Sequence, residues 1–184
     1  MKKRFRFYAF KLCGLMVVVF LLQLFISGFT EFFLLDFDAA LQIWRFFTAM
    51  FLHGDLVHLL YNLFALALFG SIFERLVGSR KFLFVFFITG ILANLVSVNF
   101  YDNSLGASGA IFGIIGALII VRPFMVVWAF GLPMPIFIAG ILWAAGDVIG
   151  IFMPGNVANL AHLSGMFFGL IFGAIYRKKS LRLA

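Results

Sequence analysis

The side chains of this sequence that could do chemistry include a serine set among glycines and the chain's three histidines. Ser108 lies in the run Leu105-Gly106-Ala107-Ser108-Gly109, at the start of an apolar segment, and His162 stands three residues before Gly165. Serine is a poor nucleophile unless a base lies within hydrogen-bond reach, and neutral imidazole is such a base near neutral pH. These residue types indicate acyl transfer, with Ser108 as the nucleophile and His162 as the general base.

An acyl-transfer site also needs hydrogen-bond donors that face the developing oxyanion. His58 and Asn62 are four residues apart, so on a helix they share one face and can point at one spot. The backbone N–H of Ser108, at a helix N-terminus, would be a further donor. We therefore expect an oxyanion hole formed by His58, Asn62 and the Ser108 amide.

The sequence offers no obvious carboxylate to orient the histidine. Asp147 precedes His162 by fifteen residues and is expected to lie deeper, while Asp55 and Asp102 fall in loops. The expected catalytic unit is therefore a Ser-His dyad and not a triad.

The amino-acid composition indicates whether this site lies in water or in a membrane. Of the 184 residues 65% are hydrophobic and only 11% are charged, and 28 are phenylalanine. No soluble domain of this length could bury so much apolar surface, so we expect an integral membrane protein. The net charge of +7 does not indicate nucleic acid, because the basic residues flank apolar runs, where they set membrane topology.

Apolar runs predict an all-α membrane protein, because the alternating pattern of a membrane barrel is absent. We expect one domain over residues 1–184 with a long interfacial first loop from Thr30 to Asp55, and an uncleaved first span. The six predicted spans are 12–29, 56–74, 82–100, 106–121, 133–152 and 159–176.

Charge predicts the orientation of these spans. With six spans both termini share one side, and of the 14 basic residues all but Arg45 fall on that side. By the positive-inside rule the termini are cytoplasmic, in a cell (inner) membrane. Spans two, four and six then run inward, which brings His58, Asn62, Ser108 and His162 to one layer that opens to the extracytoplasmic side.

Two glycine series would bring the serine to the histidine. Gly109, Gly113 and Gly116 mark one face of span four, and Gly165, Gly169 and Gly173 mark one face of span six. Small residues at this spacing let membrane helices approach closely. Packing of the two faces would place Ser108 beside His162. The alternative is that both side chains only form a hydrogen bond between helices.

At this point the residues resemble a known family, the rhomboid intramembrane serine proteases, over nearly the whole chain. The matching motifs, in order, are Trp44-Arg45, His53-x4-His58-x3-Asn62, Glu74-Arg75, Gly106-x-Ser108-Gly109 with Gly113, and Ala161-His162-x2-Gly165-x3-Gly169. The resemblance implies a six-helix bundle of minimal prokaryotic type, with Ser108 as nucleophile and His162 as base. The residues it implies as support for the site are Gly106, Gly109, Phe112 and Gly165. Phe112 stands where the family often has a tyrosine that packs against the histidine.

The resemblance also implies partners. Substrates would be single-span or multi-span membrane proteins, entering laterally past the outer loops and span five, without a cofactor or metal and without a required oligomer. Outside the site we expect Arg45 to brace the first loop through headgroups or backbone carbonyls. His53 is expected to be structural, and Glu74 and Arg75 to hold the inner end of span two.

Two other functions remain open. A non-catalytic, client-binding protein could use the same scaffold. A zinc-dependent membrane hydrolase could use His53, His58 and His162 as ligands with one open position, although the H-E-x-x-H pattern of zinc proteases is absent. A transporter is disfavoured, because the polar residues gather at one depth and form no path across the bundle.

Overall fold

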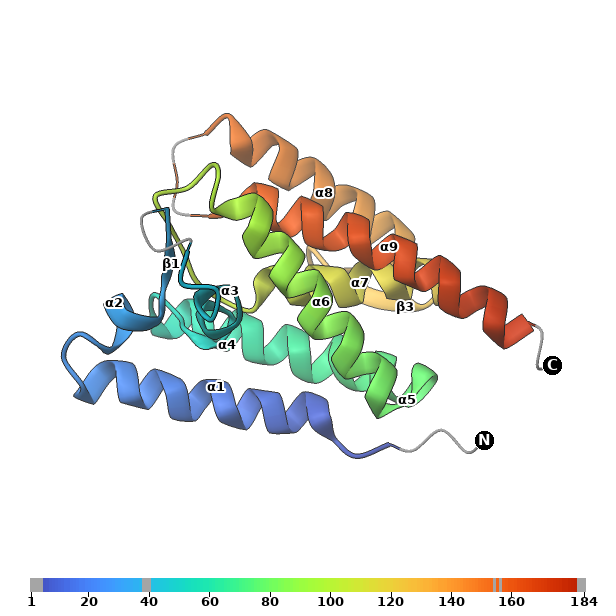
Figure 1. The fold of residues 1–184 in the computed structure, drawn as a ribbon. Coiled ribbons are helices and arrows are strands. Elements are labelled where there is room, and N and C mark those ends of the chain that lie inside the picture. The colour runs from blue at the N-terminus through green and yellow to red at the C-terminus, as the bar shows by residue number, and fades with distance from the viewer. Residues whose placement is uncertain (1–4, 38–40, 154, 156, 182–184) are drawn as a thin grey trace.

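The structure is a computed structural model that describes residues 5–37, 41–153, 155 and 157–181 (Figure 1). Of the basic residues predicted to mark the cytoplasmic side, those at 2–4 and 182 lie outside the described residues. The start of α1 and the end of α9 lie at one end of the molecule, and α2 and β1 lie at the other (Figure 1).

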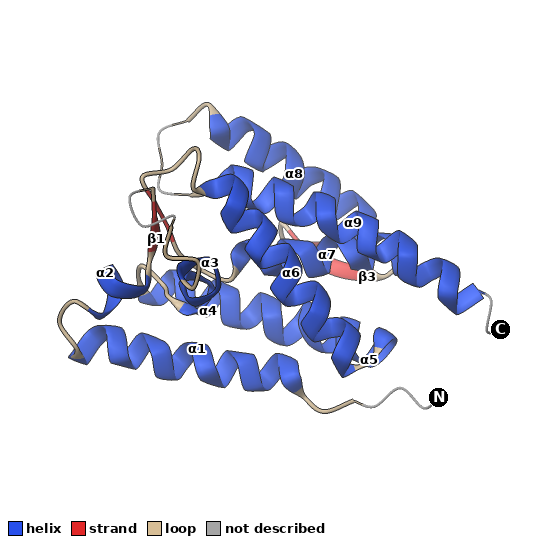
Figure 2. Ribbon diagram, in the orientation of Figure 1, coloured by secondary structure: helices blue, strands red, loops and turns tan. Residues whose placement is uncertain are grey.

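Helices make up most of the described chain (Figure 2). The longer helical elements are α1 (Tyr8–Phe25), α4 (Leu56–Ala65), α6 (Ser79–Ser97), α7 (Ser108–Val121), α8 (Ile136–Ile151) and α9 (Asn159–Leu181). The shorter ones are α2 (Phe29–Phe33), α3 (Arg45–Thr48), the 3-10 turn η1 (Ala49–Phe51), the π-helical η2 (Leu66–Gly70) and α5 (Ser71–Val77). Elements α4, η2 and α5 follow one another without a break.

Four helical stretches among the described residues are long and apolar enough to cross a membrane: Tyr8–Phe25, Leu56–Val77, Ser79–Ser97 and Asn159–Arg177. Helices α7 and α8 are apolar but shorter. The predicted ranges 12–29 and 82–100 were set too late in the chain. Helix α1 ends before Gly28 (φ +78°), and α6 starts directly after Gly78 (φ +90°), backbone conformations that favour glycine and interrupt a helix.

The all-α prediction is wrong in one respect, because the described residues contain two small antiparallel sheets. In one, β1 (Leu35–Asp36) pairs with β2 (Asn103–Ser104). In the other, β3 (Val126–Ala129) pairs with β4 (Leu132–Pro135) across a two-residue turn, Phe130–Gly131. Both turn residues have positive φ, 54° and 76°, as a type I′ hairpin turn requires, and β3 is rich in residues that favour strands.

Helix α7 forms the centre of the bundle. Nine of its 14 residues are buried, and they occur on all of its faces because α4, η2, α6, α8 and α9 pack around it. Because neighbouring elements pack around α7, they hold the side chains of its first residues in a fixed position. Its first residue is Ser108.

The predicted contact between the two glycine series is confirmed. A Cβ atom built on Gly165 would collide with the carbonyl oxygen of Gly109, and one built on Gly169 would collide with the carbonyl oxygen of Gly113. Further along, Gly173 lies against the backbone of Ala117. Helices α7 and α9 therefore touch backbone to backbone, which only glycine at these positions permits.

Polar contacts fasten α1 at its two ends. At its start, the Glu74 carboxylate of α5 accepts hydrogen bonds from the backbone N–H groups of Tyr8 and Ala9, each at 3.1 Å. Near its end, the amide of Gln23 donates to the His53 carbonyl at 3.1 Å and accepts from the His53 N–H at 3.0 Å. Glu74 thus holds the C-terminal end of its helical stretch, the end at which the sequence predicts this role, against α1.

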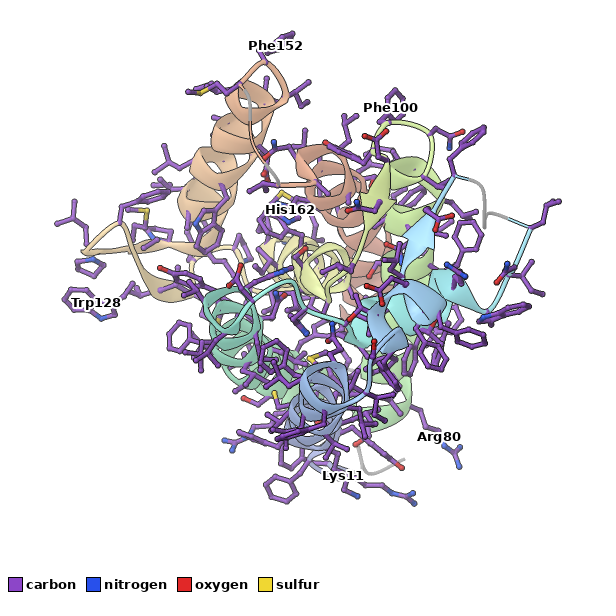
Figure 3. The ribbon with its side chains drawn as sticks, turned by 90° about the vertical axis from the view of Figure 1, so that its left-hand side faces the viewer. Lys11, Arg80, Phe100, Trp128, Phe152 and His162 are labelled. Carbon is purple, nitrogen blue, oxygen red and sulfur yellow. The ribbon has the colours of Figure 1, made fainter. Side chains whose placement is uncertain are left out.

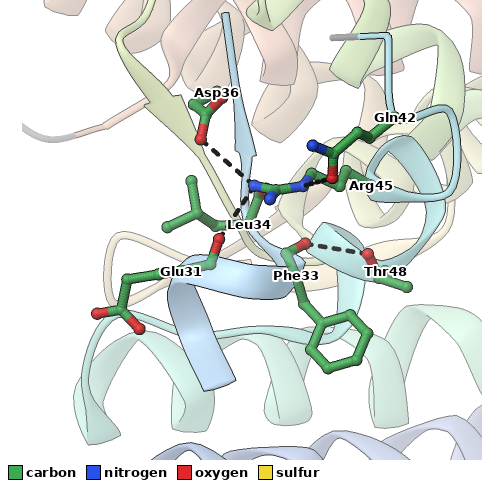
Figure 4. Close-up of polar contacts among 7 residues, drawn as sticks. All are labelled: Glu31, Phe33, Leu34, Asp36, Gln42, Arg45 and Thr48. Carbon is green, nitrogen blue, oxygen red and sulfur yellow. Dashed lines mark hydrogen bonds and ion pairs between the residues drawn. The ribbon is translucent and has the colours of Figure 1, made fainter. Parts of the chain in front are cut away.

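Arg45 braces the segment between α1 and α4 (Figure 4). Its Nη1 donates to the carbonyl oxygens of Glu31 and Leu34, at 3.0 and 2.9 Å, and lies 3.3 Å from the Asp36 carboxylate. Its Nε donates to the Gln42 side chain at 3.0 Å. Arg45 itself is 8% exposed, so its guanidinium is largely shielded from water, whereas the Asp36 carboxylate is partly exposed. The predicted anchoring to backbone carbonyls is confirmed.

Replacing Arg45 by alanine is expected to lower the free energy of unfolding by about 1–3 kcal/mol, because the Glu31 and Leu34 carbonyls and the partly exposed Asp36 carboxylate lose a charged donor. Lysine should restore little of this, since an ammonium lacks the planar fork of donors. The measurement is a denaturant titration in mixed micelles, with the exposed Arg80→Ala as the matched charge deletion. Equal midpoints for Arg45→Ala and Arg80→Ala would show that the brace contributes nothing.

Candidate active site

The site begins at the turn into α7. Gly106 has φ +115°, a conformation that L side chains rarely adopt, and its N–H donates to the Ala49 carbonyl at 2.9 Å. A Cβ at Gly106 would lie 2.8 Å from both Cε1 and Nε2 of His58 and 4.0 Å from the Ser108 Oγ. Glycine is thus needed here for the turn and for the space, and both the His58 ring and the Ser108 hydroxyl lie close to it.

His58 and Asn62 lie in the first two turns of α4. The Asp55 carboxylate caps this helix, accepting from the His58 N–H at 2.7 Å, which fixes where the helix begins. Asn62 is buried, and its Nδ2 donates to the His58 carbonyl at 3.0 Å. The amide predicted to face an oxyanion is therefore bonded to its own helix.

The imidazole of His162 is held on two sides. The Phe112 ring stacks on it with a centroid separation of 4.3 Å and an interplanar angle of 3°. Its Nδ1 lies 2.9 Å from Oδ1 of Asp147, whose side chain is 9% exposed. In the view onto the end of the bundle, His162 lies among the helices, whereas Trp128 and Phe152 lie at the periphery (Figure 3).

The expectation that no carboxylate would lie near His162 is wrong. Asp147 is only four residues before the last residue of α8, and His162 is three residues after the first of α9. At 1.5 Å per residue these offsets are about 6 Å and about 4.5 Å, so both side chains lie at nearly the same depth. Had the depth of each residue been counted from the end of α8 and from the start of α9, which are joined by one loop, the pair would have been predicted.

The packing of α7 on α9 brings Ser108 and His162 into the same region. A Cβ at Gly109, next to Ser108, would lie 3.5 Å from the carbonyl oxygen of Ala161, next to His162. Ser108 is partly exposed, and neither its hydroxyl nor Nε2 of His162 makes a hydrogen bond to any described residue. The first turns of the two helices are adjacent, and the Ser108 hydroxyl and Nε2 of His162 are both without a hydrogen-bond partner among the residues described.

His53 is a buried neighbour of His58. It is 1% exposed, its ring meets the His58 ring edge-on at 5.1 Å, and neither ring nitrogen has a hydrogen-bond partner among the described residues. Burial, with a smaller effect from His58, lowers the pKa of His53 to about 4, so it is uncharged at neutral pH. Of the described histidine, cysteine and carboxylate side chains, no three gather closely enough to hold a metal ion.

The sequence is similar to proteins of one family. A family model described as Rhomboid domain matches residues 40–179. The chain is 31% identical over 147 residues to Rhomboid protease GlpG of Haemophilus influenzae, covering 76% of this chain and 74% of that one. It is 32% identical over 145 residues to Putative rhomboid protease YdcA of Bacillus subtilis, covering 76% of this chain and 70% of that one.

A plant relative is similar over a smaller part of its own length. RHOMBOID-like protein 7 of Arabidopsis thaliana is 30% identical over 134 residues, which are 72% of this chain and 42% of the relative. The chain therefore spans about two fifths of the length of that protein, whereas it spans about three quarters of the Haemophilus protease.

Proposed function

The chain belongs to the rhomboid family, and on that basis we propose that it is an intramembrane serine endopeptidase acting on membrane-spanning segments of other proteins. The observation that carries the proposal is the arrangement of two first turns. Ser108 begins the buried helix α7, and His162, with its ring held by Phe112, lies on the adjacent first turn of α9. Bacterial relatives that bear the name of protease support it.

In the proposed reaction Ser108 Oγ attacks the scissile carbonyl carbon while Nε2 of His162 takes the hydroxyl proton. The unpartnered state of these two atoms is compatible with this, because catalytic hydrogen bonds often form only when substrate is bound. His162 then gives the proton to the leaving amine. Water, deprotonated by the same imidazole, hydrolyses the acyl-enzyme and regenerates Ser108.

The proposed oxyanion donors are the Ser108 backbone N–H, the His58 ring and the Asn62 amide. The Ser108 N–H, at the positive end of α7, donates to no acceptor among the described residues. The His58 ring lies against Gly106, two residues away from the nucleophile. Asn62 has two amide hydrogens, so it can keep its bond to the His58 carbonyl and still donate to an oxyanion.

We further propose six spans in a single domain, with α7 and α8 as the two short ones and a long first loop. The described basic residues at one end of the bundle support cytoplasmic termini and a site that opens on the opposite side of an inner membrane. They are Arg6, Lys11, Arg75, Arg80, Lys81, Arg122 and Arg177. The proposed substrates are single-span or multi-span membrane proteins, and neither a cofactor nor an oligomer is required.

A biotinylated fluorophosphonate, which reacts with activated serines, tests the proposal. We expect labelling of the purified protein at Ser108, identified by peptide mass spectrometry, because the first turn of α7, which carries this serine, lies beside the first turn of α9, which carries the His162 imidazole. Labelling should disappear in His162→Ala and persist in Ser164→Ala, a control on the same helix whose hydroxyl only bonds the Ala161 carbonyl at 3.1 Å.

Two results would count against the proposal. A wild-type protein that binds a membrane-protein client yet reacts with no serine probe and forms no product would indicate the non-catalytic alternative. Cleavage that a chelator abolishes and zinc restores, with no label at Ser108, would indicate the zinc hydrolase.

A further inference from the structure

We propose that Asp147 is a positioning residue for His162, so that the catalytic unit of this chain is Ser108–His162–Asp147 and not a dyad. The inference rests on the proposed function of the same site and adds to it the group that fixes the general base. It depends on the Asp147–His162 contact, on the stacking of Phe112, and on the burial of the carboxylate.

The contact joins two helices at one depth. Asp147 comes from the last turns of α8 and His162 from the first turn of α9, and the two helices pack against each other. The Nδ1 to Oδ1 distance of 2.9 Å is that of a hydrogen bond. A deprotonated carboxylate only accepts, so the bond requires hydrogen on Nδ1. Nε2 then carries the lone pair that a general base needs.

Two different motions of the ring are restrained. Phe112, stacked at 3°, fixes the plane of the imidazole. Asp147 meets the ring at its edge and so restrains its rotation about the Cβ–Cγ bond. Phe112 alone would allow the ring to turn over about that bond, which exchanges the positions of Nδ1 and Cδ2 and those of Nε2 and Cε1. The bond to the carboxylate therefore determines on which side of the ring the two nitrogens lie.

The surroundings of Asp147 argue for more than a helix–helix bond. Asp147 is 7% exposed, and its second oxygen, Oδ2, is buried without a hydrogen-bond partner among the described residues. Buried unpaired oxygens are uncommon, and each calls for an explanation. A bond that only joined α8 to α9 would need no charge. A carboxylate has a use here if an imidazolium forms beside it when His162 takes the serine proton.

The test is Asp147→Asn. Asparagine is nearly the same size and can still bond Nδ1, but its amide can donate to that nitrogen and so favour the tautomer with hydrogen on Nε2. We expect kcat to fall by about 10²–10⁴-fold with KM changed less than about threefold, since the tautomer matters to proton transfer and not to substrate binding. Asp147→Glu, which keeps the carboxylate, should recover part of kcat.

A second readout does not depend on activity. In protein labelled with ¹⁵N-histidine, the imidazole shifts report which nitrogen carries hydrogen. We expect the Nδ1–H form at His162 in the wild type and a loss of that form in Asp147→Asn. The His162 signals are assigned by their absence in His162→Gln.

Asn94→Ala is the matched control, because Asn94 is also buried, lies three residues from the end of α6, and joins two segments through its bond to the Phe46 carbonyl at 2.8 Å. We expect it to lower the thermal midpoint while leaving the His162 tautomer unchanged. If Asp147→Asn behaves like Asn94→Ala, with wild-type kcat and tautomer, the inference is overturned.

The inference and the proposed function can fail separately. If wild type cleaves substrate, His162→Ala does not, and Asp147→Asn cleaves at full rate, the protease assignment stands and the positioning role is overturned. If wild type cleaves nothing but the Nδ1–H tautomer depends on Asp147, the positioning of the imidazole is supported and the protease assignment falls.

Discussion

Replacing Ser108 by alanine is expected to lower the rate of substrate cleavage by about 10⁴-fold or more, because the variant has no atom that can form the acyl-enzyme. Donors to the oxyanion and the bound geometry would remain, so any residual rate would come from them alone. The measurement is the initial rate on a purified single-span substrate in proteoliposomes, with the product identified by mass spectrometry.

The expected loss must be separated from a loss of folding. Ser108 is the first residue of α7, where alanine is a good helix former and no side-chain cap is removed, so the thermal midpoint should stay close to that of the wild type. Ser164→Ala should keep full activity. A Ser108→Ala protein that forms the same product at more than about a tenth of the wild-type rate would mean that another group is the nucleophile.

Replacing Gly169 by alanine is expected to have the largest effect on stability. The new methyl group would collide with the Gly113 carbonyl, which belongs to the backbone of α7 and cannot rotate away. Overpacking usually costs about 1–3 kcal/mol, and we expect about 3 kcal/mol or more here because two whole helices must separate. Titration with SDS in mixed micelles, followed by circular dichroism, measures the free energy of unfolding.

Gly14→Ala is the matched control for Gly169→Ala. Gly14 lies in α1, and a Cβ there would have no heavy atom within 4 Å. Alanine is favoured over glycine inside a helix by up to about 1 kcal/mol, so this variant should be as stable as the wild type or slightly more so. If both variants unfold at the same SDS fraction, the close contact between α7 and α9 does not determine stability.

The features that could be predicted from sequence are those that depend on spacing within one helix. Gly109 and Gly113 repeat with the period of a helix, and so do Gly165 and Gly169, which is why their contact follows from the sequence. The stacking of Phe112 on His162 was expected from the family resemblance, and the rings do stack. These predictions need only the spacing within each helix and one assumption, that the small-residue faces of α7 and α9 pack against each other.

The features that could not be predicted depend on how separate segments meet. The Asp147–His162 pair was missed because separation along the chain was taken as separation in depth, although the chain reverses between α8 and α9. The hairpin of β3 and β4 was missed because β3 falls between the predicted spans 106–121 and 133–152, where no element was expected, and because its turn at Phe130–Gly131 lacks the usual Asn-Gly or Asp-Gly signal.

The contacts that fasten α1 have a consequence for the order of assembly. This helix leaves the ribosome before any other part of the bundle. Yet the amides of Tyr8 and Ala9 bond to Glu74, more than 60 positions later, and Gln23 bonds to His53, 30 positions later. The start of α1 therefore lacks these bonds until Glu74 in α5 has been translated, and Gln23 near its end lacks its bond until His53 has been translated.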